Sequence, residues 1–184
     1  MNNTNTRIYI ANLGKYNEGI LQGEWVNLPI TEEDLEEVYI RIGVAHRDED
    51  GDFHSYYEED GICYEEVAIH DYESEFDELK ICEWDNIEEL SAKVEELEAL
   101  DTWELNATYS LMEAYSYTLE EALGRLNNCT FWNDYTMEDL AYELIETCYD
   151  LPEFALRYFD YAAFARDLEF DGYTETKYGV ILDC

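Results

Sequence analysis

Apolar side chains recur at helical spacing in three stretches of the chain, and acidic side chains fill most positions between them. Thr31, Asn86 and Thr136 precede these stretches and are typical N-cap residues. The pattern therefore predicts amphipathic helices over 32–42, 86–100 and 137–148. Their apolar stripes consist of Leu35, Val38, Tyr39 and Ile42; of Ile87, Leu90, Val94 and Leu97; and of Met137, Leu140, Ala141, Leu144, Ile145 and Cys148.

Segments in which apolar and polar residues alternate, and which are rich in residues that favour strands, predict a small sheet near the N-terminus. Strands are expected over Arg7–Asn12, Gly23–Leu28 and Tyr64–Tyr72, the last with Val67 and Ile69 facing inward. The glycine-rich segment 13–22 is expected to be a loop. Residues 45–61 are expected to be a mobile acidic loop. Together with the helix over 32–42, these strands predict an α+β unit.

The remaining pattern predicts a helical middle and a mixed C-terminal region. A helix capped by Asp101 or Thr102 should run through Met112, and Thr118 should open a short helix that ends near residue 127. A strand over Cys129–Trp132 precedes the third amphipathic helix. Short helices over 153–159 and 161–168, and a hairpin over 172–183, complete the pattern. We expect an α+β fold divided into domains at 1–76, 77–128 and 129–184.

The net charge of the chain adds most to these structural predictions. The chain has 184 residues with 46 Asp and Glu against 10 Lys and Arg, a formal net charge of −36. The densest segment, 32–104, holds 28 acids and four bases. Nucleic-acid binding is excluded, because it requires a basic face. Since 47% of the residues are hydrophobic, the chain is expected to fold and to present its charge to a basic partner.

The size of the charge suggests what it imitates. Duplex DNA carries one charge per about 1.7 Å, so 36 charges match about 61 Å, or roughly 18 base pairs. Helical neighbours lie about 5–6 Å apart, which makes a phosphate-like row of carboxylates physically reasonable. Ordinary solvated helix faces and adaptation to high salt are the competing interpretations of the charge. The scarcity of Lys argues against the first, and the 17 Tyr and neutral first 31 residues against the second.

Catalytic and metal-binding motifs are missing from the sequence. It has no phosphate-binding glycine loop, and none of His46, His54 and His70 pairs with another ligand at zinc spacing. Asp48, Asp50, Asp52 and Glu59 fit four positions of a calcium loop, but Phe53 replaces its required glycine. We therefore expect no catalysis, no cofactor and no metal.

Cysteine usage and hydropathy bear on location. The five cysteines, Cys63, Cys82, Cys129, Cys148 and Cys184, are odd in number and widely spaced, which favours reduced thiols in the cytoplasm. No apolar run approaches the roughly 20 residues of a membrane span, and the negative charge disfavours anionic membrane surfaces.

Several strings resemble one known family. The string Ile8 to Gly19 (IYIANLGKYNEG) is similar to the opening signature of the ArdA antirestriction proteins. Gly23–Pro29, Glu65–Glu73, Ile87–Leu90 and 158–168 resemble later parts of that family. Residues 47–61 depart from the family pattern as an acidic insertion before the third strand.

The resemblance implies an elongated chain of three small domains that forms a homodimer through its C-terminal domain. It implies a DNA mimic that occupies the DNA groove of a type I restriction–modification enzyme, at its methyltransferase core, and blocks restriction and, to a varying degree, modification. The alternative is an acidic inhibitor or chaperone of another basic protein, such as a nucleoid protein or a nuclease.

Charge, helix periodicity and the resemblance together select the candidate site residues. The dimer contact is expected at Cys129, Thr130, Phe131 and Trp132, although these residues could equally fill the core of their own domain. The phosphate-mimicking carboxylates are expected to be Glu32, Glu33, Glu36, Glu37, Glu88, Glu89, Glu95, Glu96, Glu98, Asp101, Glu104, Glu138, Asp139, Glu143 and Glu146.

Overall fold

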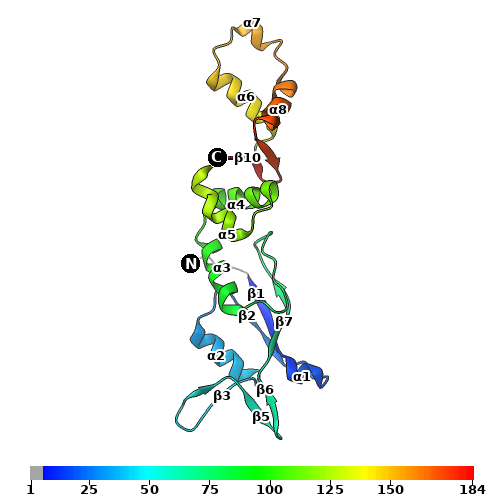
Figure 1. The fold of residues 1–184 in the computed structure, drawn as a ribbon, viewed down its shortest axis with the longest axis vertical. Helices are drawn as coiled ribbons and strands as arrows, with labels where there is room; N and C mark the ends of the chain where they lie inside the picture. Colours follow the sequence, from blue (N-terminus) through cyan, green and yellow to red (C-terminus); the bar gives the residue numbers. More distant parts are fainter. Residues whose placement is uncertain (1–5) are drawn as a thin grey trace. The chain divides into compact units, whose positions relative to one another are not determined.

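The computed structural model describes residues 6–184, which form two compact units (Figure 1). The N-terminal unit extends to Ala99 and the C-terminal unit covers Leu100–Cys184. Both combine helices with small antiparallel sheets, so the expected α+β class is confirmed. The finer division into three domains stays a prediction.

A three-stranded antiparallel sheet organises the N-terminal unit. Strand β1 (Arg7–Asn12) lies between β2 (Gly23–Asn27) and β7 (Val67–Glu73). On β1, Ile8 and Ile10 are fully buried, as the alternation predicts. A register shift between Tyr9 and Ile10 in the pairing with β7 accompanies burial of both Ala68 and Ile69. Strict alternation therefore fails on β7, and Val67 is only half-buried.

Helices α2 (Glu32–Arg41) and α3 (Ile87–Glu98) follow the predicted periodicity closely. Thr31 and Asn86 accept hydrogen bonds from the backbone of the first helical turn, as N-caps do. Ser91 on α3 joins the segment before α2, because its Oγ accepts from Ile30 N at 2.7 Å and donates to Ile30 O at 3.2 Å. The apolar stripes face inward: Leu35, Val38, Ile42, Ile87, Leu90, Val94 and Leu97 are all buried.

Two predicted loops contain regular structure instead. The first holds helix α1 (Leu13–Asn17), which begins at Asn12 because the amide oxygen of that residue accepts from Lys15 N at 2.9 Å. The second, expected to be mobile, holds hairpin β3–β4 (His46–Arg47 and Phe53–His54) and strand β5 (Tyr57–Glu59), which pairs with β6 (Ile62–Tyr64).

The turn of the β5–β6 hairpin explains why the prediction of a mobile loop over 45–61 was wrong. Asp60 and Gly61 both have positive φ, at 53° and 82°, which is the geometry of a two-residue hairpin turn of the Asp-Gly type. Because β5 is short and two of its three residues are glutamates, its composition hid this signal. The expected third strand, Tyr64–Tyr72, is consequently two strands, with Tyr64 ending β6 and Val67 beginning β7.

The C-terminal unit is built around the sheet β8–β10–β9, formed by Cys129–Asn133, Gly179–Asp183 and Thr174–Thr176. Helices α4 (Thr102–Tyr115) and α5 (Leu119–Arg125) supply one core, followed by a 3-10 turn (Leu126–Asn128). Helices α6 (Met137–Cys148) and α8 (Tyr161–Phe170) supply the other. The short helix α7 (Glu153–Leu156) lies between α6 and α8 in the sequence (Figure 1).

Strand alternation separates these two cores. Ile181 packs with the α4 and α5 cluster, whereas its neighbour Val180 packs with the α6 and α8 cluster. Phe131 and Trp132 on β8 divide in the same way. Adjacent strand residues point to opposite faces, so one thin sheet supports two apolar layers.

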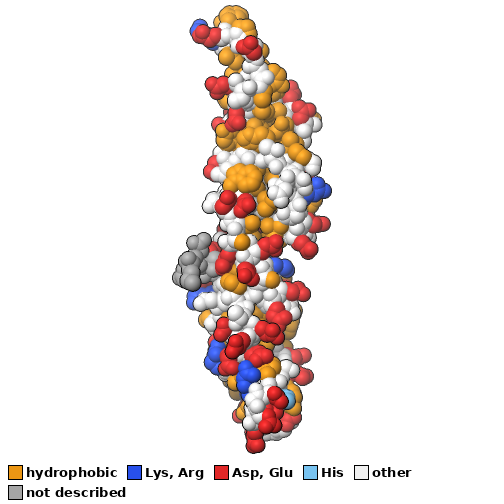
Figure 2. All heavy atoms as spheres, turned by 90° about the vertical axis from the view of Figure 1, so that its left-hand side faces the viewer, with side chains coloured by type: hydrophobic (Ala, Val, Ile, Leu, Met, Phe, Trp, Pro, Cys, Tyr) orange, Lys and Arg blue, Asp and Glu red, His pale blue; other side chains and the backbone are white. Residues whose placement is uncertain are grey.

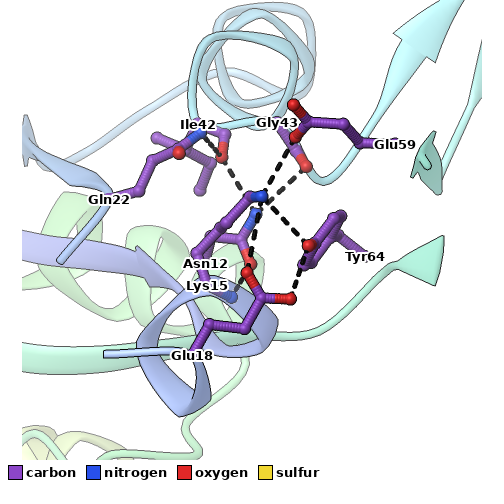
Figure 3. A network of polar contacts seen from close by, with 8 residues as sticks. All are labelled: Asn12, Lys15, Glu18, Gln22, Ile42, Gly43, Glu59 and Tyr64. Atoms are coloured by element: carbon purple, nitrogen blue, oxygen red, sulfur yellow. Dashed lines mark hydrogen bonds and ion pairs between the residues drawn. The ribbon is translucent and has the colours of Figure 1, made fainter. Parts of the chain in front are cut away.

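Asn12 provides a test of the N-terminal unit. Its buried side chain caps α1 and donates to the carbonyl oxygens of Ile42 and Gly43 at 3.1 and 3.0 Å (Figure 3). We expect Asn12→Ala to lower the free energy of unfolding by about 2–4 kcal/mol, because a cap and two buried hydrogen bonds are lost. Urea unfolding followed by circular dichroism measures this.

Asn27→Ala is the matched control, because Asn27 is exposed on strand β2. Its effect should stay within about 0.5 kcal/mol. Equal effects of the two substitutions would show that the Asn12 contacts contribute nothing to stability.

Candidate partner-binding surfaces

Helix α2 presents one group of the predicted carboxylates. Glu32, Glu33 and Glu37 are exposed and Glu36 is half-buried, all on the side away from the apolar stripe. Arg47 on β3 bridges two of them, with Nη2 at 2.9 Å from Glu36 Oε2 and 3.2 Å from Glu37 Oε1. Strand β3 is therefore attached to this helix, and Arg47 neutralises part of the charge of α2.

Helix α3 presents a second and less compensated group. Glu88, Glu89, Glu95 and Glu96 are exposed, while Glu98 is half-buried. The charge of Glu88 also reaches α2: burial first, and then this charge, raise the pKa of Tyr39 above its usual value. Glu88 of α3 therefore lies close to Tyr39 of α2.

Asp101 and Glu104 have a different role from that of free surface charges. The Asp101 carboxylate accepts from Glu104 N at 2.8 Å, and the Glu104 carboxylate accepts from Asp101 N at 2.9 Å. This capping box satisfies backbone N–H groups at the start of α4. The sequence predicted a cap at Asp101 or Thr102; the structure places it at Asp101 and engages both carboxylates in it.

Helix α6 carries the last predicted acids. Glu138, Asp139 and Glu146 are exposed and Glu143 is half-buried. Asp139 forms a capping box with Thr136, whose hydroxyl and backbone N–H donate to it at 2.6 and 3.0 Å and hold the pKa of Asp139 below its usual value. Asp139, Glu143 and Glu146 line an open hollow together with Asp134, Tyr135 and Tyr142.

The predicted dimer residues lie on β8, an edge strand of its sheet. Phe131 is 6% exposed, in the α4 and α5 core, and Trp132 packs against the α6 and α8 core. Cys129 is half-buried and Thr130 is exposed. The two aromatic side chains therefore have partners within their own unit, and Thr130 is the member most available to another chain.

Lys15 holds a polar network that the sequence pattern did not predict (Figure 3). Its Nζ donates to Tyr64 Oη at 2.9 Å and lies 3.0 Å from Glu59 Oε2 and 3.5 Å from Glu18 Oε2. The Tyr64 hydroxyl in turn donates to Glu18 at 2.7 Å. Helix α1 is thereby joined to the β5–β6 hairpin. The only local signal in the sequence was Glu18, three positions after Lys15.

Several arginines are used in the same way. Arg7 on β1 pairs with Glu73 on β7, Arg41 on α2 pairs with Glu24 on β2, and Arg125 pairs with Asp183. Each pair joins segments that are distant in sequence. Together with Lys15 and Arg47, five of the ten Lys and Arg therefore connect elements of the chain, and the majority of the acids keep their charge on the surface.

The residues of the calcium-loop pattern and the histidines have structural roles. Asp48 Oδ1 accepts from Asp50 N and Asp52 N, and Asp48 Oδ2 lies 3.1 Å from His54 Nε2, so this carboxylate closes the β3–β4 turn. His70 packs edge-on against Tyr16, at 4.5 Å between ring centroids. Within residues 6–184, no group of three or more His, Cys, Asp or Glu is placed to hold a metal ion.

Figure 2 shows how the two units differ on one face. Acidic side chains are closely spaced over the N-terminal unit, whereas hydrophobic side chains cover much of the C-terminal unit, with acids among them. No helix in the described part of the chain is long and apolar enough to cross a membrane.

Comparison with known proteins identifies one family. The model of the family described as antirestriction protein (ArdA) matches residues 8–182. No curated protein matches the chain. The matched range extends through both compact units and includes the β3–β4 and β5–β6 hairpins and Lys15.

Lys15 yields a pH-dependent prediction. Hydrogen bonds from Lys15 to Tyr64 and Glu59 raise the pKa of the ammonium group above its ordinary value. The stabilisation is therefore complete below the unfolded-state pKa, about 10.4, and is lost as the pH rises through the folded-state pKa. Lys15→Met should lower the urea midpoint by a constant amount between pH 6 and 9, and by less at higher pH.

Lys93→Met is the control, because Lys93 is exposed on α3. Urea unfolding curves of both variants and of the unmodified protein, measured from pH 6 to above the unfolded-state pKa of lysine, provide the comparison. A loss for Lys15→Met that does not shrink at high pH would assign the effect to packing of the side chain instead.

Proposed function

Because the chain belongs to the ArdA family of antirestriction proteins, we propose that it acts as a mimic of DNA. In this proposal it occupies the DNA-binding groove of a type I restriction–modification enzyme, at the methyltransferase core, and prevents restriction. Modification is blocked to the extent that it uses the same groove. The protein performs no catalysis and acts in the cytoplasm by competition.

The observation that carries the proposal is the arrangement of charge on rigid helices. Buried stripes fix α2, α3 and α6 against their units, so their glutamates point outward in fixed rows. Neighbouring carboxylates at i, i+3 and i+4 stand about 5–6 Å apart, comparable in scale to a phosphate row. A basic groove cannot hold both this surface and a duplex.

The net charge of −36 also predicts the character of binding. Steering by a strong field accelerates association and weakens as salt rises. The attraction is spread over many carboxylates, so no single one should dominate. Asp101, Glu104 and Asp139 contribute as charges that are held in place by capping hydrogen bonds.

Displacement of DNA tests the proposal. The protein should release a labelled recognition duplex from a purified type I methyltransferase at stoichiometric concentration. Glu88→Gln alone should change the dissociation constant less than about fivefold, since one surface charge contributes roughly 0–1 kcal/mol. Joint replacement of Glu88, Glu89, Glu95 and Glu96 by Gln should weaken binding more than about tenfold.

The control removes four charges elsewhere: Glu120, Asp167, Glu169 and Asp171, all exposed in the C-terminal unit, are replaced by their amides. Equal weakening by both sets would mean that total charge, and not the α3 row, determines affinity. Failure of the folded protein to displace the duplex would reject the type I target. Binding to a nucleoid protein or nuclease would then favour an acidic inhibitor of another class.

We also propose that the protein is a homodimer through its C-terminal unit. The edge position of β8 supports this, because an edge strand offers unpaired backbone groups to a second copy. Since Phe131 is buried in its own core, Thr130→Glu is the better test. It should convert the dimer to a monomer in size-exclusion chromatography with light scattering, without loss of folding.

Thr174→Glu on β9, the opposite edge of the same sheet, is the matched control and should remain dimeric. A dimer that survives Thr130→Glu would place the contact outside β8.

A further inference from the structure

The hollow on helix α6 combines charge with aromatic surface. It measures about 660 Å³ and is lined by Asp134, Tyr135, Asp139, Tyr142, Glu143 and Glu146, with no basic residue among them. We refer to it as the α6 hollow. Three of its acids were predicted as phosphate mimics, but the two tyrosines have no counterpart in a phosphate row. A different kind of recognition is therefore built into this part of the surface.

Two acids of the hollow, Asp139 and Glu143, are held in place by hydrogen bonds. Asp139 is fixed by its capping box with Thr136. The Tyr135 hydroxyl donates to the Glu143 carboxylate, and this bond together with the Glu143 charge raises the pKa of Tyr135. Residues 139, 143 and 146 lie on one side of α6, because they are four and three positions apart. The result is an acidic rim in which Asp139 and Glu143 are held by hydrogen bonds.

The ring of Tyr142 is also held in place. It is 52% exposed, yet it stacks on Tyr161 of α8 with 3.8 Å between centroids. Tyr161 in turn meets Phe159 edge-on at 5.0 Å. An exposed ring supported from behind keeps its orientation without a partner, so little side-chain entropy is lost when another group packs on it.

This combination matches one side chain better than others. A guanidinium group is planar, stacks on aromatic faces and forms paired hydrogen bonds with carboxylates. A lysine ammonium group is more strongly hydrated and lacks the planar fork. A second copy of this chain is disfavoured, since its own α6 acids would approach the same charges. A basic protein has the complementary charge.

We infer that the α6 hollow receives an arginine side chain of the basic partner, with the guanidinium packed on Tyr142 and paired with the surrounding carboxylates. This inference rests on the proposed function for the identity of the partner, but not for the chemistry of the hollow. It adds a specific anchor to an interaction otherwise carried by distributed charge.

The chemistry can be tested without any restriction enzyme. Aromatic ¹H–¹³C spectra of protein labelled at tyrosine would be recorded during titration with arginine amide and, separately, with lysine amide. The Tyr142 signal, identified by its loss in Tyr142→Phe, should shift more with arginine amide. Glu146→Gln should reduce that shift, and Glu120→Gln on α5 should not. Equal or absent shifts with the two amides would overturn the inference.

The partner is tested by duplex displacement from the type I methyltransferase. Tyr142→Leu should weaken inhibition about threefold to tenfold, the range expected for loss of a cation–π contact. Tyr142→Phe should remain close to the unmodified protein, as should Tyr158→Leu, which alters a 77% exposed ring outside the hollow. Unchanged inhibition by Tyr142→Leu would overturn the role of the hollow in this complex.

The two experiments separate the possible failures. Selective arginine binding without displacement of DNA by the unmodified protein would reject the proposed function and leave the arginine site standing. Displacement that is insensitive to Tyr142→Leu would reject the arginine anchor and leave the mimicry standing.

Discussion

Repulsion between like charges shapes every part of this protein. A net charge of −36 on 184 residues opposes every compact arrangement. The apolar interior must offset this cost, and it does so with continuous stripes on α2, α3 and α6, whose buried members are aliphatic or sulphur-containing side chains. The acids are then left at the surface, where water and salt screen them best.

The few cations are placed where they hold the chain together. Lys15 joins α1 to the β5–β6 hairpin, Arg47 joins β3 to α2, and Arg7 joins two strands. Each of these contacts is modest by itself, because exposed ion pairs contribute little. Their value lies in position, since Lys15 and Arg47 fix the acidic hairpins between β3 and β6, which their surroundings would otherwise repel.

Carboxylates also serve the backbone. Asp101 and Asp139 satisfy N–H groups at helix starts, where the helix dipole favours negative charge. An acidic surface can thus support its own helices at their N-terminal ends. For the proposed mimicry of DNA this is useful, because the same group orders the scaffold and presents charge. The Tyr-lined hollow on α6 adds shape to that charge, and shape is what distinguishes one basic partner from another.

Local sequence was enough to establish the amphipathic helices, their N-caps and the α+β class, because helical periodicity and capping are properties of neighbouring residues. It also established the family through its opening signature, which the match over residues 8–182 confirms. The prediction of exposed glutamates on α3 was largely correct for the same reason: Ile87, Leu90, Val94 and Leu97 fix which side is buried.

Packing of the elements settled which charges are engaged and which side chains meet. The pairing of Lys15 with Glu59, the burial of Phe131 and the stacking of Tyr142 on Tyr161 all join residues that are far apart in sequence or belong to different elements. Such contacts depend on how helices and strands come together, and no local pattern encodes that. The amount of charge was therefore evident in the chain, whereas its arrangement into a surface required the fold.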